Sequence, residues 1–256
     1  MKISPLAQEM IINYKELLLG NARVTCPYFN NKKTGKRAGL RVLIGKGSPI
    51  EITDEASLIA LKEHLDLFTA SKDEIRKFLV DQNLGVDCSA FAYHVLGAQV
   101  KDQTNKQLKN NITFAKTNNF FRKIIQKIRI VENTNVQVLS DDVNSHEVVL
   151  SDIKPADMII MKGFSGGATV RDHVLIVSEV DDNKIVYHHS LKWNTDTYKK
   201  HGIKMGEIFI TDKTKSITDQ TWHEGQKKGD ENETLQRALK SSYCAIRRLN
   251  ILDEKK

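Results

Sequence analysis

Gly85-Val86-Asp87-Cys88-Ser89-Ala90-Phe91 is the stretch that decides how the rest of the chain is interpreted. Aspartate is a good N-cap residue, because its carboxylate accepts hydrogen bonds from the free backbone N–H groups of a first helical turn. The run from Ser89 to Leu96 therefore predicts a helix that begins here. Cys88 would stand at its N-terminus, where the partial positive charge favours a thiolate over a thiol. Since a thiolate attacks carbonyl carbons, Cys88 is a candidate nucleophile.

A nucleophilic cysteine needs a base, and Arg171-Asp172-His173-Val174 offers one far downstream. We expect Cys88 on a helix and His173 on a strand, so the two must meet in space. The base also needs a partner for its second ring nitrogen. The next predicted strand ends in His188 and His189, and alternation allows only one of them to face His173. The residues themselves leave open which one.

The charge that develops on an attacked carbonyl oxygen requires hydrogen-bond donors. The backbone N–H of Cys88 is one candidate. The side-chain amide of Gln82 is another, although an exposed loop glutamine is the ordinary interpretation of that residue. Asp87, Ser89 and Gly167 are candidates for contact with the substrate. The remaining histidines lack the spacing of metal ligands, and the sequence predicts neither a metal site nor a cofactor.

The composition indicates one large domain, or one domain with additions. The chain has 256 residues, of which 40% are hydrophobic. It contains no run of about 18 apolar residues, which predicts no membrane span. Its first residues lack the apolar core of a secretory signal, so we expect a cytoplasmic protein unless export uses another route or a leader is missing. The three cysteines fit a free thiol better than a disulfide framework.

The net charge of +7 is unevenly distributed. The segment from Gln103 to Val131 contains seven basic residues and no acidic one. Such a block is either a solvated face or a surface that holds an anionic polymer near the site. No nucleic-acid motif accompanies it, so we expect no nucleic-acid partner. The candidate contacts for a polymer are Lys106, Lys109, Arg122, Lys123 and Lys127.

The order of the predicted elements indicates an α+β domain. Apolar spacing and capping signals predict helices at 5–19, 53–65, 71–80, 89–96 and 117–126. Alternating or short apolar runs predict strands at 40–44, 137–139, 158–161, 173–180, 184–190, 208–210 and 245–249. Residues 163–168 are expected to form a flexible connection. Helices first and strands later is the pattern of N-terminal helices packed on a central antiparallel sheet.

At these residues the chain resembles the NlpC/P60 branch of the papain-like cysteine hydrolases. The stretch from Asp87 to Phe91 is similar to that family's Asp-Cys-Ser-Gly-Phe motif, with alanine in place of the glycine. Residues 154–160 are similar to its Pro-Gly-Asp-Leu stretch, and residues 172–177 to its His-Val-Gly-Ile-Tyr strand. Tyr187-His188-His189-Ser190 is similar to its Ile-His-Ala-Ser ending, which favours His188 as the partner of the base.

The resemblance covers roughly residues 78–192. It implies a papain-like fold and an enzyme that cleaves peptide or amide bonds, commonly in bacterial cell-wall peptides, through an acyl-enzyme and without a metal. It divides the chain into a helical and loop extension over 1–75 and a catalytic domain over 76–256 with a basic insertion at 103–131. The alternatives are an acyltransferase, or an inactive member of the fold that binds an anionic polymer. The family's Tyr-x-x-Gly-Gly segment upstream of the cysteine is absent from 76–80.

Overall fold

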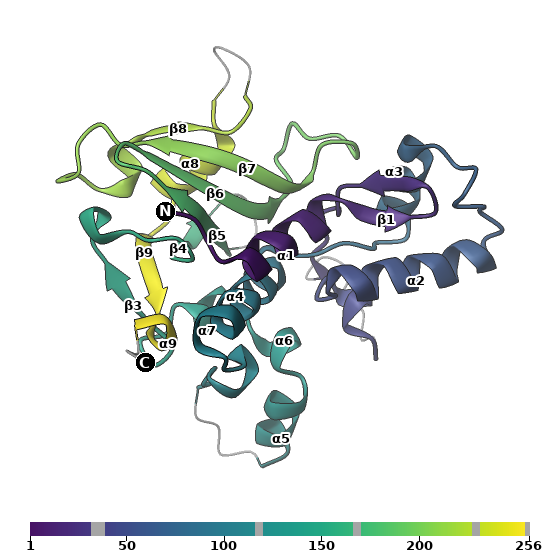
Figure 1. The fold of residues 1–256 in the computed structure, drawn as a ribbon, viewed down its shortest axis with the longest axis horizontal. Helices are drawn as coiled ribbons and strands as arrows, with labels where there is room; N and C mark the ends of the chain where they lie inside the picture. Colours follow the sequence, from purple (N-terminus) through teal and green to yellow (C-terminus); the bar gives the residue numbers. More distant parts are fainter. Residues whose placement is uncertain (32–38, 116–119, 166–169, 227–230, 254–256) are drawn as a thin grey trace.

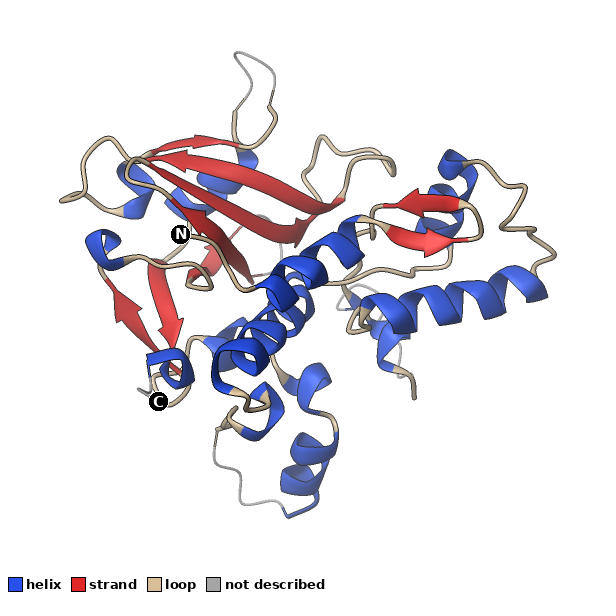
Figure 2. Cartoon of the chain, in the orientation of Figure 1, coloured by secondary structure: helices blue, strands red, loops and turns tan. Residues whose placement is uncertain are grey.

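A computed structural model describes residues 1–31, 39–115, 120–165, 170–226 and 231–253. Within these ranges the chain folds as a mixed α+β structure around an antiparallel sheet, with helices on both of its faces (Figure 2). The predicted α+β class is therefore confirmed. No helix in the described part of the chain is long and apolar enough to span a membrane.

The main sheet has seven strands in the order β3-β9-β4-β5-β6-β7-β8, and each neighbouring pair is antiparallel. The last strand in the sequence inserts between β3 and β4, as expected of a closing strand. The strands are β3 Ser145–Val148, β4 Met158–Ser165, β5 Val170–Val180, β6 Lys184–Leu191, β7 Gly202–Phe209, β8 Thr221–His223 and β9 Tyr243–Leu249. A separate hairpin pairs β1 Leu17–Leu19 with β2 Ala22–Val24.

One long helix, α4, organises the helical side of the molecule (Figure 1). It packs against α1 and against the sheet strands β5 and β6, and it shares one hydrophobic core with α1 and β5. A second core lies on the opposite face of the sheet and includes part of α8. The helices are α1 Pro5–Lys15, α2 Pro49–Lys62, α3 Lys72–Asp81, α4 Cys88–Thr104, α5 Phe120–Ile128, α6 Ile130–Asn133, α7 Val136–Leu139, α8 Glu233–Leu239 and α9 Asn250–Asp253.

Several predicted elements are wrong, each at a short apolar run whose period does not distinguish helix from strand. The expected helix over 5–19 ends at Lys15, and the chain then forms the β1–β2 hairpin. The expected strand at 40–44 is a 3₁₀ helix. The expected strand at 137–139 is helix α7, whose N-cap Asn135 accepts from the Val138 N–H. Residues 163–165, expected as a connection, continue β4.

The short segment before α4 is held by three other parts of the chain. The Val86 N–H donates to the Pro27 carbonyl at 3.0 Å, and the Asp87 N–H donates to the Gly45 carbonyl at 2.9 Å. The Ser190 hydroxyl, on β6, donates to the Val86 carbonyl at 2.7 Å. The start of α4 is therefore fixed jointly by the N-terminal residues and by the sheet.

Gly85 is required by this crossing, because a Cβ there would clash with the Pro27 backbone carbonyl. We expect Gly85→Ala to lower the free energy of unfolding by about 1–3 kcal/mol, measured by denaturant or thermal unfolding. Gly97→Ala in α4 is the matched control, since nothing lies within 4 Å of the added Cβ. Replacing glycine inside a helix should there be neutral or stabilising by up to about 1 kcal/mol. Equal stability of the two variants would contradict the close crossing.

Candidate functional site

Cys88 occupies the first position of α4, as the sequence predicts. The Asp87 carboxylate caps the helix by accepting from the Ala90 N–H at 2.8 Å. The Cys88 side chain is buried, and the backbone N–H of Val174 lies close enough to its sulfur to lower the pKa of the thiol. Val174 directly follows His173, so α4 places Cys88 against the part of β5 that carries the candidate base.

The carboxylate that caps α4 also belongs to a buried ion pair. Lys46 Nζ lies 3.0 Å from Asp87 Oδ2, and it donates to Ser89 Oγ at 2.6 Å and to the Thr134 carbonyl at 3.2 Å. The Ser89 hydroxyl in turn donates to Asp87 Oδ1 at 2.9 Å. Asp87 and Ser89, predicted to contact substrate, are thus placed in a buried network beneath the start of α4.

A chain of buried polar side chains extends from His173. Its Nε2 lies 2.7 Å from His189 Nδ1, and His189 Nε2 lies 3.1 Å from Glu224 Oε1. The Tyr187 hydroxyl donates to Glu224 Oε2 at 2.6 Å. The His189–Glu224 contact is within ion-pair distance but is not aligned as a hydrogen bond, and neither atom has another partner among the described residues. At this distance, a rotation of the His189 ring would align its Nε2–H with the Glu224 carboxylate.

The charge of Glu224 determines where the protons lie along this chain. Burial raises the pKa of Glu224, but the charge and N–H of His189, with the Tyr187 hydroxyl, outweigh burial and keep the pKa below its usual value. A carboxylate only accepts, so in a neutral His189 the proton lies on Nε2, toward Glu224, and Nδ1 is left to accept. His173 must then donate from Nε2, which leaves its Nδ1 as an acceptor.

Only one of the two adjacent histidines faces His173, as alternation requires. His189 makes the contact, whereas the family resemblance favoured His188. His188 points to the opposite face of the sheet, where its Nδ1 lies 3.0 Å from Ser178 Oγ. The pairing of β5 with β6 shifts register at Ser178, between the hairpin turn and the two histidines of β6. Such a shift changes which residue faces which side, and local sequence does not reveal it.

Burial keeps both central groups neutral in this structure. Burial raises the pKa of the Cys88 thiol to about 12, and the Asp87 charge adds to the rise. Burial, the charge of His189 and the charge of Arg237 hold the pKa of His173 well below its usual range. The expectation that the helix N-terminus yields a thiolate is therefore reversed, because the cost of burying a charge exceeds the effect of the helix end.

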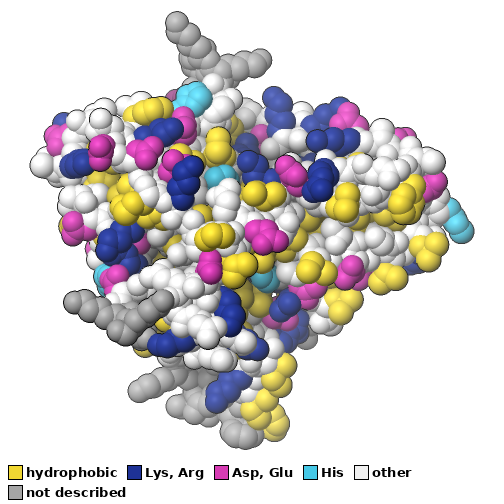
Figure 3. Space-filling view, in the orientation of Figure 1, with side chains coloured by type: hydrophobic (Ala, Val, Ile, Leu, Met, Phe, Trp, Pro, Cys, Tyr) yellow, Lys and Arg dark blue, Asp and Glu magenta, His cyan; other side chains and the backbone are white. Residues whose placement is uncertain are grey.

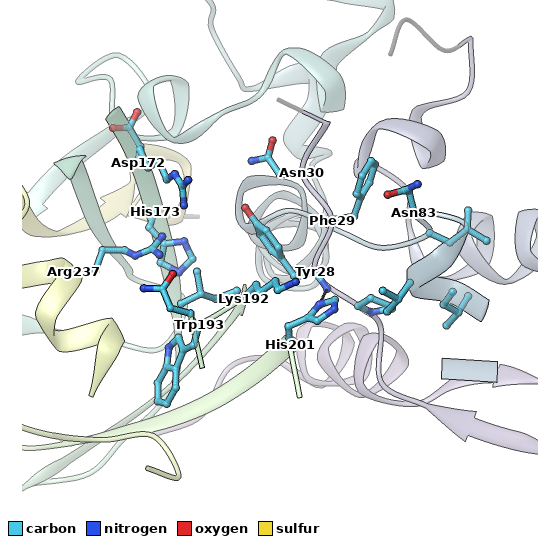
Figure 4. Close-up of a pocket in the computed structure, with 17 residues that line it drawn as sticks. Tyr28, Phe29, Asn30, Asn83, Asp172, His173, Lys192, Trp193, His201 and Arg237 are labelled. Atoms are coloured by element: carbon cyan, nitrogen blue, oxygen red, sulfur yellow. Dashed lines mark hydrogen bonds between the residues drawn. The ribbon is translucent and has the colours of Figure 1, made fainter. Parts of the chain in front are cut away.

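A cavity of about 490 Å³ opens beside His173 (Figure 4). Its wall combines the N-terminal residues Tyr28 to Asn30 with the ends of β5 and β6 and with α8. Burial raises the pKa of the Tyr28 hydroxyl, and electrostatic repulsion from the Cys88 thiolate, wherever that thiolate forms, would raise it further. The lining residues are Pro27, Tyr28, Phe29, Asn30, Leu79, Val80, Asn83, Leu84, Arg171, Asp172, His173, Leu191, Lys192, Trp193, Asn194, His201 and Arg237.

The remaining predicted residues lie elsewhere. Gln82 is the C-cap of α3 and is half-buried; its neighbour Asn83, rather than Gln82, lines the cavity. Gly167 lies outside the described residues. In the basic segment, Lys106, Lys109 and Lys127 are exposed, whereas the side chains of Arg122 and Lys123 on α5 lie outside the described part of the structure.

Four residues of the site were missed by sequence reasoning. Lys46 stands in a Gly-Lys-Gly stretch that reads as a turn, and Glu224 follows a three-residue strand in a polar region. Trp222 is a large apolar residue in that polar region and is buried in the fold, so its presence is the weak sequence signal for a buried strand before Glu224. Tyr28 and Arg237 reach the cavity from parts of the chain that carry no recognisable motif.

Comparisons with known proteins identified no relative: no family model, curated protein or solved structure matched the chain. Within the described ranges, no group of three or more His, Cys, Asp or Glu side chains is arranged to hold a metal ion.

The neutral state of Cys88 predicts a distinctive pH dependence of alkylation. Because only the thiolate reacts, the rate of modification by iodoacetamide should rise about tenfold per pH unit from roughly pH 6 to 9 and still rise at about pH 10. Mass spectrometry of the Cys88 peptide measures this rate, with a free-cysteine peptide as the reference. A plateau below about pH 8 would instead indicate a thiolate paired with an imidazolium, and would contradict the raised pKa.

Proposed function

We propose that this chain is a papain-like cysteine hydrolase of the NlpC/P60 type that cleaves peptide or amide bonds. The observation that carries the proposal is the buried chain from Glu224 through His189 to His173, whose next residue, Val174, has its backbone N–H against the sulfur of Cys88 at a helix N-terminus. Burying two histidines and a carboxylate is costly, and a structural role alone would be met more cheaply by apolar residues. Buried, perturbed groups beside a cavity favour a catalytic role.

In the proposed reaction, Cys88 attacks the carbonyl carbon while His173 accepts the thiol proton at Nδ1. The carbon–sulfur bond forms as the carbonyl π bond gives its electrons to oxygen. His173 becomes an imidazolium, which His189 and the Glu224 carboxylate stabilise. It then returns the proton to the leaving amine, and a thioester remains on Cys88. A water molecule, deprotonated in the same way, hydrolyses this acyl-enzyme.

Two donors are available for the negative oxygen of the tetrahedral intermediate. The backbone N–H of Cys88 belongs to the first turn of α4, whose N–H groups have no helical acceptor. The Tyr28 hydroxyl lies near the thiol and lines the cavity. In this proposal it takes the place of the tyrosine that the family carries upstream of the cysteine. A Tyr28→Phe protein that kept its full kcat would exclude this role.

The proposed substrate is a bacterial cell-wall peptide. This part rests on the family resemblance, since the cavity itself only requires an amide that fits a wall of mixed polar and apolar groups. The proposed mechanism holds for any peptide or amide of suitable shape. An acyltransferase would use the same residues, and a product formed with an added amine would distinguish it from a hydrolase.

A second candidate function is binding of an anionic polymer through the basic segment at 103–131. The favouring observation is that Lys106, Lys109 and Lys127 of this segment are exposed. Helix α5, which carries Lys127, also has hydrophobic side chains that gather at the lower edge of the molecule (Figure 3). Phe121, Ile124, Ile125 and Ile128 on that helix are exposed, and so is Lys127. Salt-sensitive binding of an anionic wall polymer by a Cys88→Ala protein would support this function alongside catalysis.

Incubation with purified bacterial peptidoglycan tests the proposed function. We expect new peptide fragments, whose mass spectra identify the cleaved amide bond, and a loss of at least about 10³-fold in rate for Cys88→Ala. Cys244→Ala is the matched control, because Cys244 is on β9 and packs against the second core rather than at the start of α4. It should keep activity within about twofold. Unchanged hydrolysis by Cys88→Ala would overturn the proposal.

Replacement of Glu224 tests the proton arrangement. In Glu224→Gln the side chain loses the charge that stabilises the imidazolium, so kcat should fall by about 10- to 100-fold with little change in KM. Glu207→Gln removes a carboxylate from β7 that pairs with Lys184, and should leave kcat unchanged. Equal kcat values for the two variants would show that Glu224 does not act on His173.

A further inference from the structure

Arg237 lines the cavity, and its surroundings among the described residues leave part of its guanidinium without a partner. It projects from α8 toward His173 (Figure 4). Its guanidinium lies 5.2 Å from the centre of the Phe164 ring, and its Nε is buried without a hydrogen-bond partner among the described residues. Its charge also acts on Cys88 and on His173, so it lies beside the proposed reacting groups.

The nearby carboxylates are occupied by other donors. Glu233, one turn earlier on α8, accepts from the Asn194 N–H at 2.8 Å and from the Thr195 hydroxyl at 3.0 Å. Asp172 is the only carboxylate on the described cavity wall, and it accepts from the Gly163 N–H at 3.0 Å and from Gln137 Nε2 at 2.9 Å. Within the described part of the chain, no carboxylate lies within ion-pair distance of Arg237.

Among the described residues of the cavity wall, the side chains of Lys192 and Arg237 therefore outnumber the single carboxylate of Asp172. A guanidinium keeps its charge at any accessible pH, and withdrawing it from water without an anion is unfavourable. An anion that enters the cavity would offset that cost. Carboxylates and phosphates suit the site, because the planar guanidinium can donate two parallel hydrogen bonds to either group.

We propose that Arg237 binds an anionic group of the substrate, a carboxylate or a phosphate, next to the bond that Cys88 attacks. The inference rests on the proposed function for the scissile bond, but the anion site itself does not. It makes the substrate an acidic amide or peptide rather than a neutral one. For an amide pair that differs only in a carboxylate and its carboxamide, kcat/KM should favour the acid by about 10- to 100-fold.

Two alkylating reagents of nearly equal shape test the site at Cys88. Iodoacetate is anionic and iodoacetamide is neutral, so Arg237 should raise the ratio of their rates of Cys88 modification above the ratio for a free-cysteine peptide. We expect this excess to be lost in Arg237→Gln and partly kept in Arg237→Lys. Lys240→Gln, an equal charge change at an exposed residue just beyond α8, should leave it unchanged. A ratio equal to that of the free peptide would overturn the inference.

A second measurement does not depend on a reactive cysteine. In Cys88→Ala protein labelled with ¹⁵N, the Arg237 Nε–H resonance is followed on addition of N-acetylglutamate, N-acetylglutamine or N-acetylphosphoserine. A shift with an acidic compound but not with N-acetylglutamine supports the site, and the stronger acid identifies the carboxylate or phosphate source. No shift with either acid overturns the inference even if Cys88 is catalytic. Shifts in this protein, together with no hydrolytic activity of the protein that retains Cys88, would overturn the proposed function and leave the anion site standing.

Discussion

The buried ion pair between Lys46 and Asp87 is the interaction on which the site depends. The Asp87 carboxylate caps α4 in the interior, and Lys46, which lies 3.0 Å away, supplies the opposite charge there. Removing one partner of such a pair typically costs about 3–5 kcal/mol, since the other is left charged and unpaired. Lys46 comes from the N-terminal part of the chain, and its backbone pairs with Val86. The residues before the sheet are therefore part of what presents Cys88.

A second set of constraints acts from the opposite face of the sheet. Glu224 fixes the tautomers of both histidines, and the Tyr187 hydroxyl holds one of its oxygens. That hydroxyl fits only because Gly206 on the neighbouring strand has no side chain, since a Cβ there would overlap the end of Tyr187. The first set positions Cys88, and the second positions His173 through His189.

This arrangement explains what the sequence could predict. Cys88 and His173 carry local signals, an N-cap and an alternating strand, and local signals survive into the fold. The choice between His188 and His189 depends on a register shift, and the contribution of Glu224 depends on a strand pairing, so neither is written in local sequence. The thiolate expectation was wrong for a similar reason, because the degree of burial is a property of the whole fold.

Arg237 is placed where it can bind part of the substrate with little effect on proton transfer from Cys88 to His173. Its charge lowers the pKa of the Cys88 thiol and also lowers the pKa of His173. Transfer of a proton from Cys88 to His173 depends on the difference between the two pKa values, and a charge that moves both in the same direction changes that difference little. An anion bound at Arg237 would raise both pKa values together, again with little effect on the transfer. Arg237 is therefore suited to select an acidic substrate without altering the proton transfer that the substrate undergoes.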